Sequence, residues 1–95
     1  MNKNELITAI VKEVNITKDL AHRTLDAIII IITKTLKKNE DVTLLGFGSF
    51  QVRQRDEREG RNPKTGEKMK IKASKSPIFK VGKLLKKEVN QYEEL

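Results

Sequence analysis

Residues 53–75 constrain the fold most, because the outer half of this segment has no apolar face and cannot be buried in a core. The segment carries nine basic and four acidic residues, a net charge of +5 out of +7 for the whole chain. Asn62-Pro63-Lys64-Thr65-Gly66, near its middle, is a dense cluster of turn-forming residues. We therefore expect a long basic β-hairpin, called the arm below, that becomes ordered on a polyanion.

Short apolar runs on both sides of the arm predict a three-stranded antiparallel sheet. Residues 42–45 form the first strand, and the glycines within residues 46–50 allow a tight connection to a second strand over residues 49–59. The return strand, residues 67–75, alternates between lysines on one face and apolar side chains on the other. Residues 76–81 then lead back to the core.

The N-terminal third of the chain predicts two helices. Asn2 and Glu5 have the spacing of a capping box, and apolar residues recur at helical spacing over residues 3–14. Thr17 is placed to cap a second helix over residues 18–38. A short third helix is expected over residues 83–92, with Leu84, Leu85, Val89 and Tyr92 facing inward.

Residues 28–32 are five consecutive isoleucines in the second predicted helix. A helix that is apolar on all sides must be covered on all sides, which one small chain can hardly do. The run therefore suggests a homodimer core; an ordinary buried helix in a monomer is the alternative. The residues expected in the dimer core are Ile28, Ile29, Ile32, Leu36, Leu44, Phe47, Phe50 and Phe79.

Composition argues against several classes of function. The 95 residues make one domain with a small core, and no cysteine is present to form disulfides or zinc sites. His22 is the only histidine and is expected on the exposed side of the second helix, with no specific role. Asp56, Glu57 and Glu59 alternate with arginines, which favours ion pairs over a metal or acid–base cluster. We therefore expect no enzyme, catalytic residue, metal, cofactor or small-molecule substrate.

The first residues begin a polar helix cap rather than a signal peptide, and the longest apolar run is too short to span a bilayer. A soluble intracellular protein with no membrane partner is therefore expected. The four aromatic residues include no pair on a strand face, which disfavours a stacking platform for single strands. Pro63 is either a simple turn proline or an apolar wedge between base pairs, a device of minor-groove binders.

Three motifs carry a resemblance to a known family: Gly46-Phe47-Gly48-Ser49-Phe50, residues 60–67 (GRNPKTGE) and Phe79-Lys80-Val81-Gly82-Lys83. With the order of the predicted elements, they resemble the bacterial histone-like HU and integration host factor family over residues 1–90. The resemblance implies an α+β fold in which an intertwined dimer of helices forms a base and two arms hold DNA in the minor groove. Residues 1–38 would form the dimerisation base, residues 53–75 the DNA-binding arm and residues 83–92 the C-terminal helix.

The resemblance also assigns residues. Pro63 matches the tip proline that wedges into a base step and kinks the duplex. The arm positions that would meet DNA are Arg53, Arg55, Arg58, Arg61, Asn62, Lys64, Lys68, Lys70, Lys72 and Lys75. The body positions near flanking phosphates are Lys3, Lys80, Lys83 and Lys86.

Residues 79–83 look more like HU than like integration host factor. This implies a cytoplasmic, nucleoid-associated architectural protein that bends and compacts duplex DNA with little sequence specificity and prefers distorted DNA. Two alternatives stay open at this point. One is a sequence-preferring DNA-bending protein like integration host factor, and the other is a binder of structured RNA, whose backbone suits the same charge.

Overall fold

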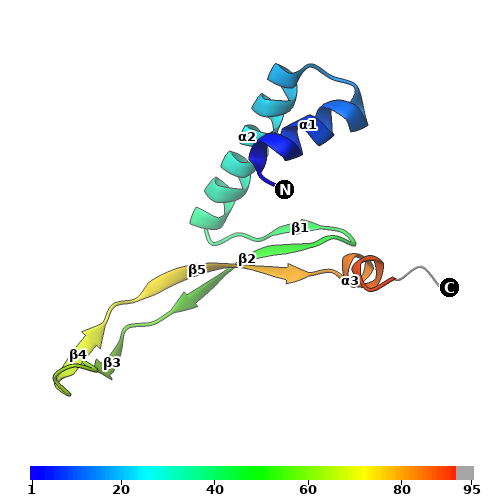
Figure 1. Cartoon of the computed structure of the whole chain (residues 1–95). Helices are drawn as coiled ribbons and strands as arrows, with labels where there is room; N and C mark the ends of the chain where they lie inside the picture. The colour runs from blue at the N-terminus through cyan, green and yellow to red at the C-terminus, as the bar shows by residue number, and fades with distance from the viewer. Residues whose placement is uncertain (92–95) are drawn as a thin grey trace. The chain divides into compact units, whose positions relative to one another are not determined.

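The computed structural model describes residues 1–91 of the chain. The elements are α1 (Lys3–Val14), α2 (Lys18–Lys37), β1 (Val42–Leu44), β2 (Gly48–Arg55), β3 (Arg58–Arg61), β4 (Lys68–Ile71), β5 (Ser74–Val81) and α3 (Lys83–Val89), as labelled in Figure 1. They confirm the α+β class, with two N-terminal helices, an antiparallel sheet that carries a hairpin arm, and a short C-terminal helix. The chain divides into two compact units, Met1–Thr35 and the residues from Leu36 onward.

The first unit contains α1 and most of α2, and local sequence signals set where these helices begin. The Asn2 side chain accepts a hydrogen bond from the Glu5 backbone N–H at 2.9 Å, and Glu5 accepts one from the Asn2 N–H at 3.2 Å. This confirms the capping box. The Thr17 hydroxyl accepts from the Leu20 N–H at 3.1 Å, as expected of the α2 cap. Asn15 ends α1 in the left-handed conformation, at φ 57°.

Burial within a single chain is sparse. In residues 1–91, Ile7 and Ala21 are the fully buried apolar residues. The isoleucine run is helical, as predicted, but Ile28 to Ile31 remain 47–60% exposed. Leu44, Phe47 and Phe79 are also 42–46% exposed, whereas Ile32, Leu36 and Phe50 are partly buried. Most of the residues expected in a dimer core are therefore open to solvent in one copy of the chain.

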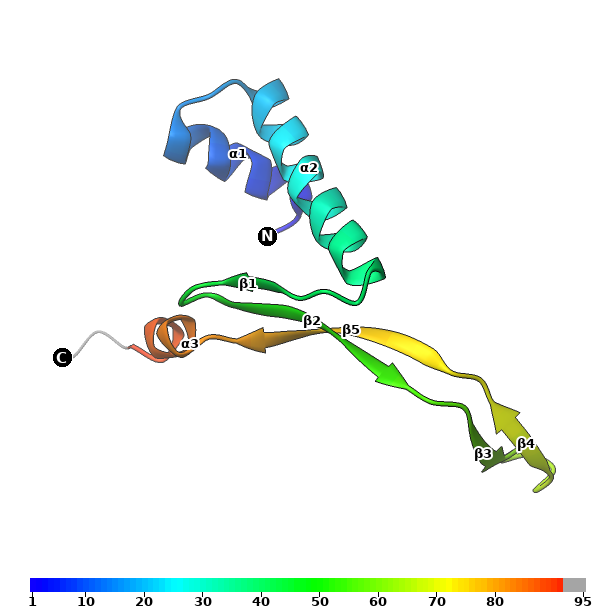
Figure 2. The ribbon, with the colours of Figure 1, turned by 180° about the vertical axis from the view of Figure 1, so that it is seen from behind.

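The second unit is built on antiparallel strands, and Figure 2 shows them from behind. β1, β2 and β5 form a three-stranded sheet in the order β1-β2-β5, and β3 and β4 form a separate two-stranded ladder. The expectation of continuous strands over residues 49–59 and 67–75 is therefore wrong: the ladder is interrupted at residues 56–57 and 72–73. The same number of residues is skipped on each strand, so the register of the hairpin continues across the interruption.

One face of the three-stranded sheet is apolar. Strand alternation and the register place the same side chains together there: Val42, Leu44, Phe50, Val52, Pro77, Phe79 and Val81. The expectation of no aromatic pair on a strand face is wrong, because Phe50 and Phe79 are register partners whose ring centroids lie 4.9 Å apart; Phe47 lies 5.5 Å from Phe79. Gly48 has to be glycine, because a Cβ there would lie 2.4 Å from Phe79 Cζ. These strand residues, together with Phe47 beside Phe79, are called the apolar face below.

Helix α3 is held against the turn between β1 and β2. The Leu85 N–H donates to the Gly46 carbonyl at 3.0 Å, and the Gly82 N–H donates to the Phe47 carbonyl at 2.9 Å. The helix ends at Val89 rather than at residue 92, because the Asn90 side-chain amide donates to the Lys86 carbonyl at 2.8 Å and caps the last turn. Tyr92, expected on the inner face of this helix, lies outside the described residues. Within residues 1–91, no helix combines the length and the apolar character needed to cross a membrane.

Candidate nucleic-acid interface

The second face of the sheet is lined mainly by polar side chains. The register pairs Ser49 with Lys80, Arg53 with Ser76 and Arg55 with Ser74, so these residues share one side. The Thr43 and Ser49 hydroxyls lie 3.1 Å apart, and the Gln51 side-chain amide donates to Ser49 Oγ at 3.4 Å. We call the following set the polar face: Thr43, Ser49, Gln51, Arg53, Arg55, Ser74, Ser76, Ile78 and Lys80.

The polar face continues along the arm. Because the register is preserved across the interruption, alternation places Glu57, Glu59 and Arg61 on this side, opposite Lys72, Lys70 and Lys68. The Glu59–Lys70 and Arg61–Lys68 pairs lie directly across the β3–β4 ladder. The Glu57 carboxylate lies 3.7 Å from the Lys70 ammonium, which supports the placement of Glu57 on the same side. This side of the hairpin therefore carries cations from the sheet to the end of the arm, with Glu57 and Glu59 between them.

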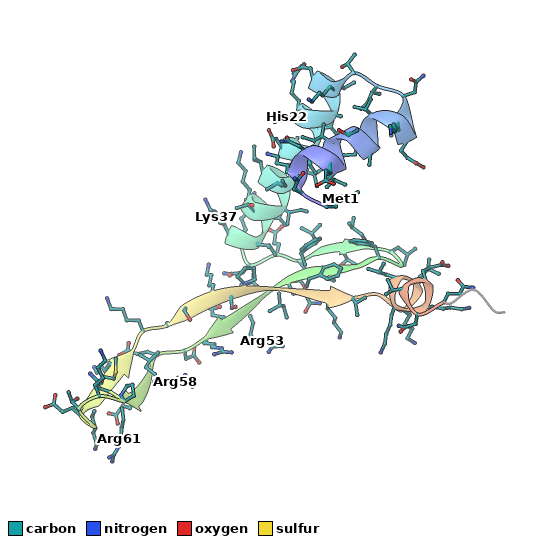
Figure 3. The ribbon with its side chains drawn as sticks, viewed as in Figure 1. Met1, His22, Lys37, Arg53, Arg58 and Arg61 are labelled. Carbon is teal, nitrogen blue, oxygen red and sulfur yellow. The ribbon has the colours of Figure 1, made fainter. Side chains whose placement is uncertain are left out.

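Two of the predicted arm residues lie on the other side. Arg58 stands opposite Ile71, whose side chain covers Gly60: a Cβ on Gly60 would lie 2.7 Å from Ile71 Cδ1. The Lys75 ammonium donates to the Lys37 carbonyl at 3.3 Å, at the C-terminal end of α2. Lys75 thus stabilises the negative end of the helix dipole instead of joining the other cations. Figure 3 shows Arg53, Arg58 and Arg61 at successive positions toward the tip of the arm.

The tip of the arm is closed by its own hydrogen bonds. The Asn62 N–H donates to the Glu67 carbonyl at 2.8 Å, and the Gly66 N–H donates to the Asn62 carbonyl at 2.7 Å. The Asn62 side chain accepts from the Lys64 N–H at 2.9 Å, which fixes the loop that presents Pro63. Gly66 has φ +73°, a conformation that favours glycine. Asn62, predicted to contact DNA, therefore also has a structural role in holding Pro63 at the tip.

The predicted body cations are distributed over both units. Lys80 lies on the polar face, and Lys83 and Lys86 lie on α3. In the helical unit, the Lys3 ammonium lies 2.7 Å from Asp26 Oδ1. This contact, together with nearby His22, holds the pKa of Asp26 below its ordinary value of 3.8. His22 is half exposed, as expected, but its Nδ1 lies 3.1 Å from Asp26 Oδ2, so it does have a specific neighbour.

Sequence reasoning missed six residues of the polar face: Thr43, Ser49, Gln51, Ser74, Ser76 and Ile78. Ser49, Gln51, Arg53 and Arg55 follow one another at a spacing of two, which on a strand means one face. That alternation was the available signal, and counting charges alone overlooked it. The ion pairs expected between the arm carboxylates and arginines are also corrected, because the ion pair that Glu57 forms is with Lys70 across the arm.

The sequence profile of the family described as "Bacterial DNA-binding protein" matches residues 1–90. The chain belongs to this family. DNA-binding protein HU of Xylella fastidiosa is 55% identical over 89 residues, covering 94% of this chain and 95% of the relative. DNA-binding protein HU-beta of Serratia marcescens is 52% identical over 90 residues, covering 95% of this chain and 100% of the relative.

The solved structures agree with the sequence relatives of this bacterial DNA-binding family. HU of Anabaena, from a cocrystal with DNA, matches with a TM-score of 0.83 and 46% identity, covering 95% of this chain and 98% of that one. HU of Thermotoga maritima matches with a TM-score of 0.67 and 33% identity. The resemblance to the HU and integration host factor family is confirmed, and it extends over nearly the full length of these relatives.

Proposed function

We propose that this chain is a non-enzymatic architectural protein that binds duplex DNA with little sequence specificity, bends it and compacts it. It would act in the cytoplasm, on the nucleoid. The observation that carries the proposal is the polar face, whose strand register is the same in the sheet and in the β3–β4 ladder of the arm. Membership of a bacterial DNA-binding family and relatives named HU support the same function.

Some cations on the polar face repel each other in the free chain and would be neutralised by phosphates. Arg61 stands directly opposite Lys68, and like charges at that position destabilise an isolated ladder. A phosphate near both side chains removes this repulsion and releases the counterions condensed on DNA. Arg53 and Arg55 face serines instead of carboxylates across β5, so they too are available. Binding through these groups depends on the DNA backbone and carries little sequence information.

The tip supplies a means of bending. Pro63 is apolar, it has a restricted backbone, and Asn62 fixes the loop around it. An apolar side chain inserted between base pairs unstacks them at a cost on the order of a few kcal/mol, offset by contacts that only bent DNA can make. DNA that is nicked or already distorted avoids part of this cost and should bind more tightly.

The proposed binding form is a homodimer. The apolar face leaves Leu44, Phe47 and Phe79 nearly half exposed, and α2 leaves Ile28 and Ile29 in the same state. Apolar surface of this extent in one small chain favours association with another copy. The dimer would include the predicted core residues, cover this surface and carry two arms, so that two prolines could kink the same duplex.

The test is binding to intact and nicked duplexes of one sequence over a salt series, measured by fluorescence anisotropy. The proposal expects log K to fall linearly with log salt, with a slope near −0.9 for each phosphate contacted, and tighter binding to the nicked duplex. The matched control lacks the arm, with residues 56–72 replaced by an Asn-Gly turn. Retention of full affinity for nicked DNA by this control would overturn the proposal.

The same assay decides between the remaining readings. Discrimination of more than about 100-fold among intact duplexes of different sequence would indicate a sequence-preferring protein instead. If duplex RNA competes as well as an equal concentration of duplex DNA, the chain binds nucleic-acid backbones without distinguishing A-form from B-form helices.

A further inference from the structure

The cations on the polar face of the arm differ in whether a carboxylate lies beside them. Arg61 and Lys68 near the tip face each other, and Arg53 and Arg55 at the base face serines. Lys70, between these groups, is different. Glu59 stands directly across the ladder from it, and the Glu57 carboxylate lies 3.7 Å from its ammonium. The middle of the polar face is therefore neutralised by the chain itself, whereas both ends remain cationic.

Glu57 lies where the ladder is interrupted, so it has no backbone pairing that explains its position. Continuing the register places it opposite Lys72 and diagonal to Lys70, a separation that long side chains can bridge. The Glu57 and Lys70 side chains are 57% and 79% exposed. An ion pair this exposed contributes little to folding and exchanges readily with other ions. Its main effect should therefore appear when another anion approaches Lys70.

We propose that Glu57 is an affinity-determining residue of the arm, which competes with DNA phosphate for Lys70. The inference rests on the proposed function, and it identifies a residue that weakens DNA binding. When a duplex meets the polar face, Lys70 exchanges the carboxylate for a phosphate, and Glu57 is left beside DNA and takes up a cation from solution. That uptake offsets one of the counterions that Lys70 releases from the DNA. Glu57 thus lowers both the affinity and its dependence on salt.

The competition determines which parts of the arm contact phosphate first. The tip and the base keep cations that no carboxylate faces across the ladder, so they can meet phosphates at once. In the middle, Lys70 meets phosphate only after its contact with Glu57 opens. A chain with this arrangement should dissociate faster from DNA than its count of arm cations suggests, because the carboxylate is ready to recapture Lys70.

The experiment compares Glu57→Gln with Asp56→Asn. The two variants remove the same charge from adjacent residues, but continuing the strand alternation from Arg55 places Asp56 on the side opposite Lys70. With E57Q, we expect Kd for a nicked duplex at 0.1 M salt to fall about 5- to 10-fold, and the salt slope to steepen by up to about 0.9. With D56N, we expect a gain of about twofold at most and no change in slope.

A double-mutant cycle identifies the partner of Glu57. In a Lys70→Gln background, E57Q should lose its effect on the slope, because the cation that it frees is absent. Equal effects of E57Q and D56N, or an E57Q slope change that persists with K70Q, would refute the competition. Failure of the wild-type chain to show any salt-dependent duplex binding would instead refute the proposed function. Circular dichroism of each variant checks that the fold is retained.

Discussion

The apolar and polar faces of the β1–β2–β5 sheet are both left open by a single chain, but they need different partners. On the apolar face, Phe47 and Phe79 stay nearly half exposed, and only other apolar surface relieves that cost. On the polar face, Arg53 and Arg55 need anions and tolerate water. Association through the apolar face is favoured by high protein concentration, and binding of anions to the polar face is favoured by low salt. One strand register therefore separates the surface proposed for assembly from the surface proposed for DNA binding, and substitutions on the two faces should produce separable effects.

The largest expected effect is on the apolar face. Phe79→Ala removes a ring that lies beside both Phe47 and Phe50, and it should lower the free energy of unfolding of the proposed dimer by about 3–5 kcal/mol. Urea unfolding at several protein concentrations measures this loss. A midpoint that does not depend on protein concentration in the wild-type chain would contradict the role of this face in dimerisation.

Next in size is a loss of binding on the polar face. Arg61→Gln should weaken duplex binding about tenfold and reduce the magnitude of the salt slope by about 0.9, because one phosphate contact is lost. Thermal stability should be unchanged or slightly higher, since the repulsion between Arg61 and Lys68 is removed. A lower melting temperature with unchanged binding would reverse the assignment of this face.

Pro63→Ala tests whether the tip bends DNA in addition to holding it. The variant keeps every cation of the arm, so the salt slope should stay near that of the wild type. The preference for nicked over intact duplex should fall several-fold, because less unstacking accompanies binding. Ligase-mediated circularisation of short duplexes measures bending, and unchanged circularisation would exclude a wedge at this position.

Lys75→Gln tests whether the side of the arm matters, because it removes a cation from the side opposite the polar face. Its ammonium donates to the Lys37 carbonyl, so the variant should lose about 0.3–1 kcal/mol of stability through the end of α2. Binding should change less than with Arg61→Gln, although both lose one positive charge. Equal losses of affinity and of salt slope in Lys75→Gln and Arg61→Gln would show that the side of the arm on which a cation lies does not affect DNA binding.

The smallest expected effect lies in the helical unit. Lys3 holds the pKa of Asp26 below 3.8, so folding favours the ionised carboxylate. The stabilisation is therefore present above about pH 4 and is lost as the pH falls through the lowered pKa of the folded state. Asp26→Asn should remove this part of the pH dependence. Melting temperatures of both proteins between pH 2 and pH 7 measure it, and parallel curves would contradict the expectation.

Local signals made much of the fold predictable from the sequence. Asn2 and Thr17 each cap a helix through atoms three residues away, so the starts of α1 and α2 required no knowledge of tertiary structure. The end of α3 was predicted too late, because the apolar spacing extends to Tyr92 while the Asn90 side chain already caps the helix. A short polar side chain of this kind competes with helix continuation, and periodicity does not detect it.

The candidate site was less predictable, because net charge does not reveal orientation. Lys75 is grouped with the DNA contacts by the family resemblance, although alternation along the return strand already separates it from Lys70 and Lys72. The pairing of Glu57 with Lys70 depends on cross-strand register, and the contact between Lys3 and Asp26 joins two helices. Such contacts between residues distant in the sequence follow from the fold and cannot be read from spacing alone.

Pro77 lies in β5, which is an outer strand of the three-stranded sheet. A proline has no N–H, so the outer row of donors on this strand is interrupted in its middle, and Lys75 and Lys80 place charges on either side of the gap. A foreign strand could not complete a regular ladder there. This edge of the sheet is thereby protected against edge-to-edge pairing into fibrils.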